Sequence, residues 1–417
     1  MSRELVVVYA HEEPPAGWDA SVFLAGPTPR DPGVASWRPE AISLLRAQWA
    51  GDGRLVVFVP EHRSGRHDSY TGQIEWEEAG LHLADVVIFW VPRDLETLPA
   101  FTTNVEWGTW HDSGRVVFGA PPDAPKNNYL LHYAGNQAVP TALTLPDTIG
   151  AALAEIGHGA RRTGGQRHVP LLLWRTASFQ RWYCAQAAAG NSLLSARVVW
   201  TFRVGPTRRS VFYWAAHVQV HVAAENRVKA NEVVISRPDL SVLALYRPGA
   251  TADDSTVVLV REFRSAASGP DGFVHELPGG SSPPDAGADA GAAQQAAPLL
   301  PSRGGADPAA DAAREAAEET GLSIAVSRIR AHGSRQLAAT MSAHQAHLFS
   351  AEVTEQELAW LRTASDRPHG AAADSERTWI EIATFREIRT GRLVDWATLG
   401  MIAEVLSTAV PRRPQTA

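Results

Sequence analysis

The feature that most constrains the fold is an alternation of continuous apolar runs with amphipathic segments over the first 120 residues. The apolar runs are short and rich in β-branched residues, which is typical of strands buried on both faces. They lie at residues 5–10, 22–26, 55–60, 85–92 and 116–121. Helical patterns separate them at residues 38–49, 74–84 and 104–114. The alternation predicts an α/β domain whose parallel sheet is covered by helices on both faces.

Polar residues follow the apolar runs where a ligand is expected. In an open parallel sheet, ligands bind beyond the carboxyl ends of the strands, and those ends read AGP, VPE and VPRD in this sequence. Glu106 begins a helical pattern after the loop that follows the fourth run, so its carboxylate is expected to point into the same cleft. A carboxylate there can act as nucleophile, acid or base at a glycosidic bond. The alternative is that Glu106 only stabilises the amino end of the helix.

The second half of the chain has a different pattern of apolar and turn residues. From about residue 168 to residue 280, β-rich runs that begin with LLLW are separated by turn residues, which predicts a largely antiparallel assembly. Residues 156–168 are rich in Gly and Arg and are interpreted as a linker. Two domains are therefore expected, at residues 1–155 and 169–417, with residues 169–235 as an accessory β segment of the second.

A helical pattern at residues 308–320 contains a cluster of acidic residues. Glu315, Glu318 and Glu319 are spaced i, i+3 and i+4, so the three carboxylates share one face. A hard divalent cation such as Mg²⁺ offsets the repulsion between them, because it binds oxygen ligands. A solvated surface helix is the alternative for an isolated Glu-Glu pair. Residues 281–306, which precede the helix, are of low complexity and are expected to form an inserted loop.

Together with the segment ELPGG that ends at Gly280, this helix resembles the Nudix hydrolase family. The family motif is a Gly, five residues, a Glu, seven residues and then Arg-Glu-aliphatic-x-Glu-Glu-x-Gly-aliphatic. Its second half matches REAAEETGL at residues 314–322. Its first half departs, because Gly280 lies 34 residues before Arg314 instead of 14, and the low-complexity segment fills the gap. The resemblance implies an α+β Nudix domain with an insertion.

The Nudix resemblance also implies a metal site. Glu315, Glu318, Glu319 and the carbonyl group of Gly280 would hold Mg²⁺ or Mn²⁺, and Arg314 would orient the glutamates. The bound metal polarises a diphosphate and lowers the pKa of the attacking water.

The same resemblance implies a substrate class. VVLVREFR followed by HELPGG is most similar to ADP-ribose and nucleoside diphosphate-sugar pyrophosphatases, so Arg261 and Glu276 are candidate substrate-binding residues. In those relatives a glutamate from a late loop often acts as the base, and Glu376 is the candidate in this sequence.

The sequence around Glu106 carries a second resemblance. VFLAGPTPR, SWRPEAISLL, VVFVPE, QIEWEEAGL and ADVVIFWVPRDLETLPAFTTNVEWGTW are similar to the nucleoside 2-deoxyribosyltransferase-like family, over about residues 20–135. The resemblance implies flavodoxin-like or Rossmann-like layers. It implies that Glu106 is the nucleophile that attacks the anomeric carbon, and that Glu77 protonates the departing base.

Four further residues take roles from this resemblance. Asp94 and Asn104 would bind sugar hydroxyl groups, and Gly26 and Pro27 would shape the floor of the pocket. Whether water or a second base accepts the sugar is left open by the sequence, since related folds include N-glycosidases and nucleotide sensors.

The composition limits the classes of molecule that the protein is expected to bind. Lys and Arg number 38 against 45 Asp and Glu, a net charge of −7, which argues against a nucleic acid partner. Cys184 is the only cysteine, so intramolecular disulfides and cysteine-clustered metal sites are excluded. No apolar run reaches the roughly 20 residues that span a bilayer, and no signal peptide is evident, so a cytoplasmic location without membrane partners is expected. Analogy with both families suggests a homodimer.

The combined prediction is an enzyme that handles a small-molecule nucleotide at two bonds. One domain would act at the N-glycosidic bond and the other at the diphosphate, in nucleotide salvage or sanitation. The alternative is a regulatory protein that senses a nucleotide, ADP-ribose or NAD, in which one domain binds without turnover.

Overall fold

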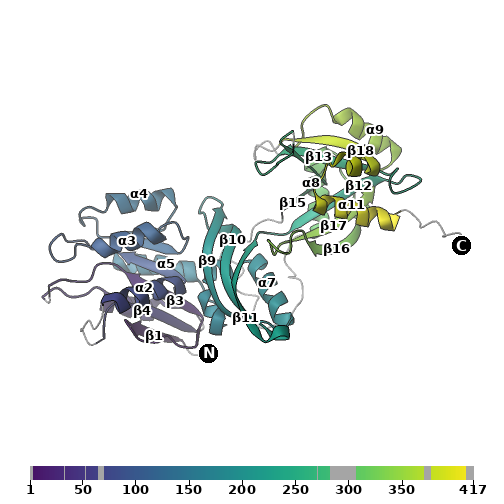
Figure 1. Ribbon diagram of the computed structural model, residues 1–417. Coiled ribbons are helices and arrows are strands. Elements are labelled where there is room, and N and C mark those ends of the chain that lie inside the picture. Colours follow the sequence, from purple (N-terminus) through teal and green to yellow (C-terminus); the bar gives the residue numbers. More distant parts are fainter. Residues whose placement is uncertain are drawn as a thin grey trace. The chain divides into compact units, whose positions relative to one another are not determined.

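The computed structural model describes most of the chain. The described residues are 3–31, 33–51, 53–63, 70–269, 271–281, 307–370 and 377–409. They form two compact units, the first ending at Ser236 and the second beginning at Arg237 (Figure 1). Nearly all of the low-complexity segment, residues 282–306, and the candidate base Glu376 lie outside the described residues.

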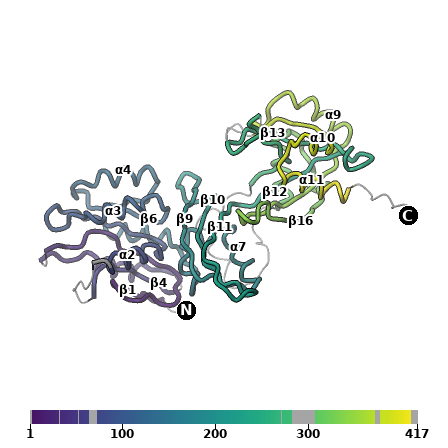
Figure 2. The backbone as a smooth tube through the Cα atoms, viewed as in Figure 1, coloured from purple at the N-terminus to yellow at the C-terminus, as the bar shows by residue number. Residues whose placement is uncertain are grey.

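The first unit contains the parallel sheet that the apolar runs predict. Its six strands are all parallel. Their order across the sheet is β1 (Glu4–Tyr9), β4 (Arg54–Val59), β3 (Ala20–Ala25), β5 (Val86–Trp90), β6 (Val116–Gly119) and β7 (Thr141–Ala142). β1 lies at one edge beside β4, as the chain trace in Figure 2 shows. Every residue of β3 and β5 is buried, which explains why these strands are apolar except for Ser21.

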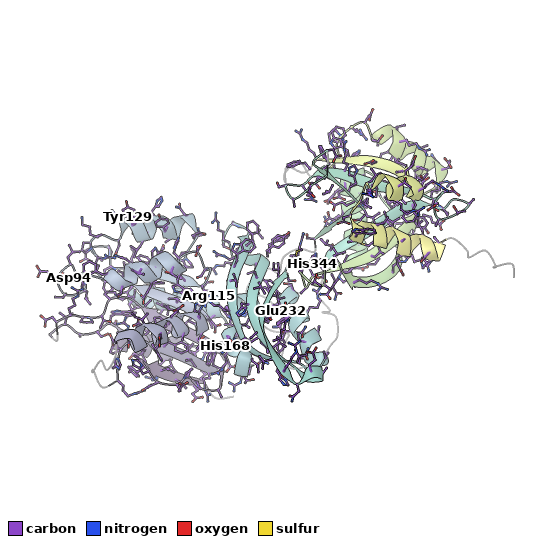
Figure 3. All side chains as sticks on the ribbon, viewed as in Figure 1. Asp94, Arg115, Tyr129, His168, Glu232 and His344 are labelled. Atoms are coloured by element: carbon purple, nitrogen blue, oxygen red, sulfur yellow. The ribbon has the colours of Figure 1, made fainter. Side chains whose placement is uncertain are left out.

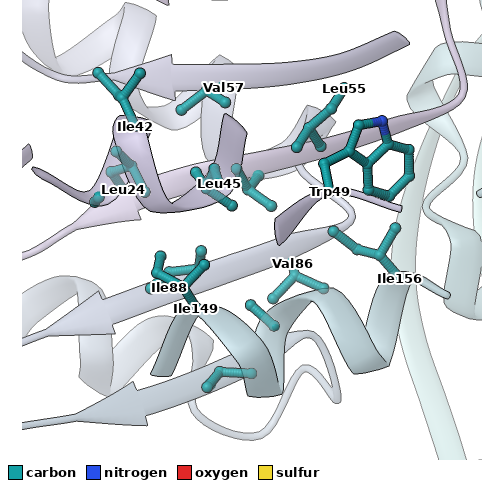
Figure 4. Packing of buried hydrophobic residues seen from close by; sticks show 14 of the residues in the cluster. Leu24, Ile42, Leu45, Trp49, Leu55, Val57, Val86, Ile88, Ile149 and Ile156 are labelled. Carbon is teal, nitrogen blue, oxygen red and sulfur yellow. The ribbon is translucent and has the colours of Figure 1, made fainter. Parts of the chain in front are cut away.

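Two layers of helices cover this sheet. One layer consists of α1 (Arg38–Gln48) and α5 (Leu145–Ile156), and the other of α2 (Tyr70–Leu83), α3 (Phe101–Trp110) and α4 (Asn128–Asn136). Figure 4 shows the first layer, in which Leu45 of α1 and Ile149 of α5 pack with Ile88 of β5. The strand order reverses between β3 and β5, because β4 follows β3 on one side and β5 lies on the other. Ligands bind at such a switch point, beyond the carboxyl ends of the strands.

Residues 156–168 belong to the first unit, which corrects their interpretation as a linker. β8 (Arg162–Thr163) pairs with β2 (Gly17–Trp18), and a 3-10 helix, η1, spans Gly164–His168. The Arg162 side chain is completely buried, and its Nη2 lies 2.6 Å from Oδ2 of Asp85. Composition misleads here because the arginine serves a buried ion pair with a residue far away in the sequence, which no local pattern reveals.

A three-stranded antiparallel sheet completes the first unit. Its strands are β9 (Ser192–Val204), β10 (Ser210–Val222), followed by a 3-10 turn, η2 (Ala223–Glu225), and β11 (Arg227–Ser236). Helix α7 (Ala177–Ala188) covers one face of this sheet (Figure 1). Phe179 of α7 packs against Trp214 of β10. The contacts therefore group this segment with the first unit, whereas we expected it to accompany the second domain.

The run LLLW is helical rather than extended, which corrects the expectation of a strand. It forms the single turn α6 (Leu171–Trp174), with Pro170 at the position before the helix. A short apolar run fits a buried helix as well as a buried strand, so its composition alone does not decide between them.

The second unit is an α+β arrangement around a seven-stranded mixed sheet. Its strands are β12 (Leu240–Arg247), β13 (Thr256–Phe263), β14 (Phe273–Glu276), β15 (Gly279–Ser281), β16 (Arg330–Gln336), β17 (Gln345–Glu352) and β18 (Thr378–Thr384). β12 and β17 are parallel and the other pairs are antiparallel. The sheet is therefore mixed rather than antiparallel throughout.

Helices cover both faces of this sheet. On one face lie α8 (Pro308–Thr320) and α9 (Glu355–Ala364), and on the other α10 (Phe385–Gly391) and α11 (Trp396–Ala409); a 3-10 turn, η4, spans Val326–Arg328. The bounds of α8 are those that its sequence pattern predicts, with Gly321 ending the helix in a left-handed conformation. Across the ranges that the structure describes, no helix is both long and apolar enough to cross a membrane.

Candidate functional site

Three ionisable side chains lie near one another at the switch point of the parallel sheet. Glu106 lies in α3, the first helix after β5, and Glu77 lies in α2, the helix before it. Arg38 begins α1, the first helix after β3, and is almost fully buried. The charges of Glu77 and Arg38 both act on Glu106. The structure thus brings the two predicted carboxylates together with an arginine that the sequence analysis did not identify.

The environment of Glu106 favours its protonated form. Burial raises the pKa of Glu106 to about 8; the negative charge of Glu77 adds to the shift, and the positive charge of Arg38 opposes it. Gln73 donates a hydrogen bond from Nε2 to Oε1 of Glu77 at 2.6 Å, which fixes the position of the second carboxylate. A carboxyl group that keeps its proton at neutral pH beside another carboxylate is the arrangement that acid–base catalysis uses.

Gly26 and Pro27 form the chain segment that leaves β3 beside this cluster. Gly26 has a φ of +151°, and a Cβ atom there would collide with the carbonyl oxygen of Trp90. The carbonyl oxygen of Gly26 accepts a hydrogen bond from Nη2 of Arg38 at 2.7 Å, and that of Pro27 accepts one from Nε1 of Trp37 at 3.1 Å. Glycine at position 26 therefore allows the end of β3 to pass close to β5.

Arg38 is held from several sides. Its Nη1 lies 2.6 Å from Oε1 of Glu61, which follows β4, and 3.1 Å from Oγ1 of Thr28. Its Nε donates to the carbonyl oxygen of Leu24 at 3.1 Å. The only sequence signals for these residues were the position of Glu61 after an apolar run and that of Arg38 at a helix start; neither signal points to their contact.

The two residues predicted to bind the sugar, Asp94 and Asn104, form hydrogen bonds within the protein. Oδ1 of Asp94 accepts hydrogen bonds from the backbone N–H groups of Glu96 and Thr97, at 3.0 and 2.7 Å, and so organises a turn. Asp94 is exposed and lies at the rim of the first unit (Figure 3). Oδ1 of Asn104 accepts a hydrogen bond from Nη2 of Arg93 at 2.7 Å. Their roles as sugar ligands stay predictions.

A known protein family matches this part of the chain. Residues 19–124 match a family described as "Nucleoside 2-deoxyribosyltransferase like". The N-terminal domain is nucleoside 2-deoxyribosyltransferase-like. The match begins just before β3 and extends past β6, so it includes Glu77 and Glu106 of the deoxyribosyltransferase-like domain. No curated protein matches the chain. Since the matched residues end at 124, the match lends no support to the Nudix resemblance of the second unit.

Carboxylates also gather in the second unit, between α8 and the sheet. Glu319 is 5% exposed, and its Oε2 accepts a hydrogen bond from the backbone N–H of Gly279 at 2.9 Å. Burial raises the pKa of Glu319 well above its usual value; the charges of Glu276, Glu315 and Glu262 raise it further, and the Gly279 hydrogen bond opposes them. The surroundings of Glu319 therefore favour its protonated form.

Arg314 binds the other two glutamates of α8. Its Nη2 lies 2.6 Å from Oε1 of Glu315, and its Nη1 lies 3.1 Å from Oε1 of Glu318. A Cβ atom on Gly280 would collide with the carboxylate of Glu315, so the glycine backbone closes against that side chain. Within the described ranges, no three histidine, cysteine or carboxylate side chains are placed to hold a metal ion. Carboxylate and carbonyl oxygens suit a hard divalent cation. To bind one ion together, however, Glu315 and Glu318 would have to break their ion pairs with Arg314.

Arg264 is a basic residue of this cluster that the sequence analysis did not identify. Its Nη2 lies 2.7 Å from Oε2 of Glu262 and 3.5 Å from Oε1 of Glu276. Arg261 and Glu276 are both predicted to bind substrate. Val260 of β13 pairs with Glu276 of β14, and successive side chains alternate across a strand, so Arg261 and Glu276 lie on opposite faces of the sheet. Arg261 instead lies over the ring of Phe273, with Cζ 4.8 Å from the ring centroid. The structure therefore separates the two predicted substrate-binding residues.

Proposed function

We propose that the deoxyribosyltransferase-like domain cleaves the N-glycosidic bond of a nucleoside or nucleotide. The observation that carries this proposal is the pair of carboxyl groups near the switch point, Glu106 and Glu77, of which the first keeps its proton at neutral pH. In the proposed reaction the carboxylate of Glu106 attacks the anomeric carbon, and the bond from this carbon to the base nitrogen breaks. Water or a second base then releases the sugar from Glu106.

The proton of the pair has a defined path in this reaction. Glu106 must be ionised to attack, so its proton moves to Glu77 when the substrate binds and from there to the nitrogen of the departing base. Arg38 favours the ionised form of Glu106, because its positive charge opposes the shift in pKa. Gln73 holds Glu77 in place. The pair must therefore carry one proton at the start of each turnover.

Base release should fall as the pH rises through about 8. Above this pH the pair loses the proton that the leaving base needs, since the pKa of Glu106 is about 8 in the free protein. The measurement is the rate of free-base formation from deoxynucleosides and deoxynucleotides between pH 5 and pH 10, with EDTA present to silence any metal-dependent activity. A rate that keeps rising above pH 9 would contradict the proposed proton path.

Two substitutions test the assigned roles. We expect Glu106→Gln to reduce base release by more than about 10³-fold, and Glu77→Gln by about 10²- to 10⁴-fold, the range for loss of a general acid. Glu75→Gln is the matched control, since Glu75 is an exposed glutamate of the same helix as Glu77 and should leave the rate unchanged. Activity of the Glu106→Gln variant close to that of the unaltered protein would remove Glu106 as the nucleophile.

We further propose that the second unit is a Nudix-type pyrophosphohydrolase for ADP-ribose or a nucleoside diphosphate sugar. The specific observation in favour is the buried Glu319, whose pKa is raised by burial and by three neighbouring glutamates. Glu315, Glu318 and Glu319 with the carbonyl group of Gly280 would hold Mg²⁺ or Mn²⁺, which when bound polarises a diphosphate and lowers the pKa of a water molecule. Glu276 would contact the substrate together with Arg264.

Metal binding and diphosphate cleavage give separate readouts for this unit. We expect Mn²⁺ to raise the thermal unfolding temperature, and ADP-ribose with Mg²⁺ to yield AMP and ribose 5-phosphate. Glu319→Gln should remove both effects while base release by the other unit continues. Glu404→Gln is the control, since Glu404 is an exposed residue of α11. If Glu319→Gln binds Mn²⁺ and cleaves ADP-ribose normally, the Nudix assignment of this residue is wrong.

The two activities together would serve nucleotide salvage or sanitation. A nucleotide derivative would be cut at the diphosphate by one unit and at the N-glycosidic bond by the other. Tight binding of ADP-ribose, NAD or a nucleotide without turnover would instead favour a sensor. Homodimer formation stays a prediction, which sedimentation of the full chain can test.

A further inference from the structure

Arg93 is a buried cation that forms no ion pair with a carboxylate of the described residues. Only 8% of its surface is exposed, and burial alone lowers the pKa of its guanidinium group. Its hydrogen bonds go to neutral acceptors, namely Oδ1 of Asn127 at 3.1 Å, the carbonyl oxygen of Pro99 at 3.4 Å and Oδ1 of Asn104 at 2.7 Å. A guanidinium group has five N–H donors. Two of them therefore lack an acceptor in the part of the protein that the structure describes.

The other buried arginines of the first unit are compensated. Arg38 and Arg162 each form an ion pair with a carboxylate at 2.6 Å. Arg115 donates to carbonyl groups at the end of α2, where the helix dipole is negative. Arg93 is the exception among the buried arginines within the described residues of this unit. Because an uncompensated buried charge is strongly unfavourable, a negative group from outside the chain would stabilise Arg93.

Arg93 lies where the substrate of the proposed reaction would bind. It follows β5 at the switch point, and its partner Asn104 precedes Glu106 by two residues in α3. Its contact with Pro99 places the guanidinium group beside the first turn of α3, whose amino end has no side-chain cap. A second arginine, Arg30, lies over the ring of Phe101, with Cζ 5.2 Å from the ring centroid. All these charges favour an anion at the start of α3.

We propose that Arg93 binds the phosphate group of a nucleoside monophosphate, so that the deoxyribosyltransferase-like domain acts on a nucleotide rather than a nucleoside. The fate of the bound nucleotide rests on the proposed function, whereas its binding through Arg93 does not. Arginine binds phosphate through two parallel N–H···O bonds, and Arg93 has two N–H donors to spare. The phosphate supplies the counter-charge that the described residues do not place beside Arg93.

The first test uses the unaltered full-length protein. With EDTA present, base release is compared for 2′-deoxynucleosides and for their 5′- and 3′-monophosphates, over all four common bases. We expect kcat/KM to be at least 10-fold higher for one of the monophosphates than for the matching nucleoside. Equal rates for nucleoside and both monophosphates would overturn the proposal.

The second test assigns the preference to Arg93. Arg93→Met should lower the ratio of kcat/KM for the monophosphate to kcat/KM for the nucleoside 10- to 100-fold, with Arg93→Lys in between. Asn104→Asp keeps Arg93 but places a carboxylate against it, so it should also reduce the preference for the monophosphate. Arg46→Met, at an exposed arginine of α1, is the matched control. If Arg93→Met and Asn104→Asp slow nucleoside and monophosphate equally, Arg93 is a structural residue and the proposal fails.

A binding measurement separates this proposal from the proposed reaction. Isothermal titration of the Glu106→Gln variant with the same monophosphates and nucleosides needs no turnover. Tighter binding of a monophosphate that is lost in a Glu106→Gln, Arg93→Met double variant supports the phosphate site even if no base is ever released. In that case the glycosidic reaction fails while the inference about Arg93 stands. Equal affinity of both ligand classes contradicts the inference.

Discussion

At the scale of single residues, the burial of Glu106 that we propose serves catalysis also lowers the stability of the fold. Its pKa is about 8 in the folded protein, whereas the ordinary value is 4.5. Between these values the unfolded chain releases a proton that the folded chain retains, so this residue destabilises the fold increasingly as the pH rises from 4.5 to 8. We expect Glu106→Gln to be more stable than the unaltered protein at pH 8 by roughly 2–4 kcal/mol, and nearly equal at pH 4.5. Urea unfolding at the two pH values measures this difference.

The same measurement contains its own control. Glu75→Gln removes an exposed carboxylate from a neighbouring helix, and it should change the free energy of unfolding by less than about 0.5 kcal/mol at either pH. A stability gain for Glu106→Gln that is the same at pH 4.5 and pH 8 would mean that the carboxyl group titrates normally in the folded protein.

At the scale of elements, β8 is joined to the parallel sheet by one buried ion pair. Asp85 accepts bonds from two nitrogens of Arg162, both at 2.6 Å, and from the backbone N–H groups of Ser21 and Leu171, both at 2.8 Å. We expect Arg162→Met to lower the free energy of unfolding of the first unit by about 3–5 kcal/mol, because Asp85 is left buried without its partner. Arg161→Met is the control: Arg161 is partly exposed, 3.3 Å from Asp19, and its loss should lower the stability by less than about 1 kcal/mol. Equal effects of the two substitutions, measured by urea unfolding, would contradict this account.

At the scale of the whole molecule, the end of the first unit decides which fragments fold. A fragment of residues 1–155 contains all six strands of the parallel sheet but lacks Arg162, so it leaves Asp85 buried and unpaired. We expect a fragment of residues 1–236 to unfold cooperatively on heating, and the fragment of residues 1–155 to lack a cooperative transition. Circular dichroism during heating distinguishes the two outcomes. A cooperative transition for the shorter fragment would show that β8 and the three-stranded sheet are dispensable for folding.

The sequence alone determined those features that repeat locally. The parallel sheet was predictable because strands buried on both faces must be apolar along their whole length, and the intervening amphipathic segments must be helices. The position of α8 was predictable from its acidic face and from Gly321, which ends it. Glu106 and Glu77 were identified because both lie in segments with a family resemblance, and the match over residues 19–124 supports the domain that contains them.

Only the tertiary structure decided the contacts between residues that are distant in the sequence. The burial of Arg162 depends on Asp85, and the pKa of Glu106 depends on Glu77 and Arg38, all of which lie in other segments of the chain. Likewise, strand alternation rather than local composition separates Arg261 from Glu276. The physical reason is the same in each case: burial and charge–charge energies depend on distances in space, and a local sequence pattern fixes such distances only within one helix or strand.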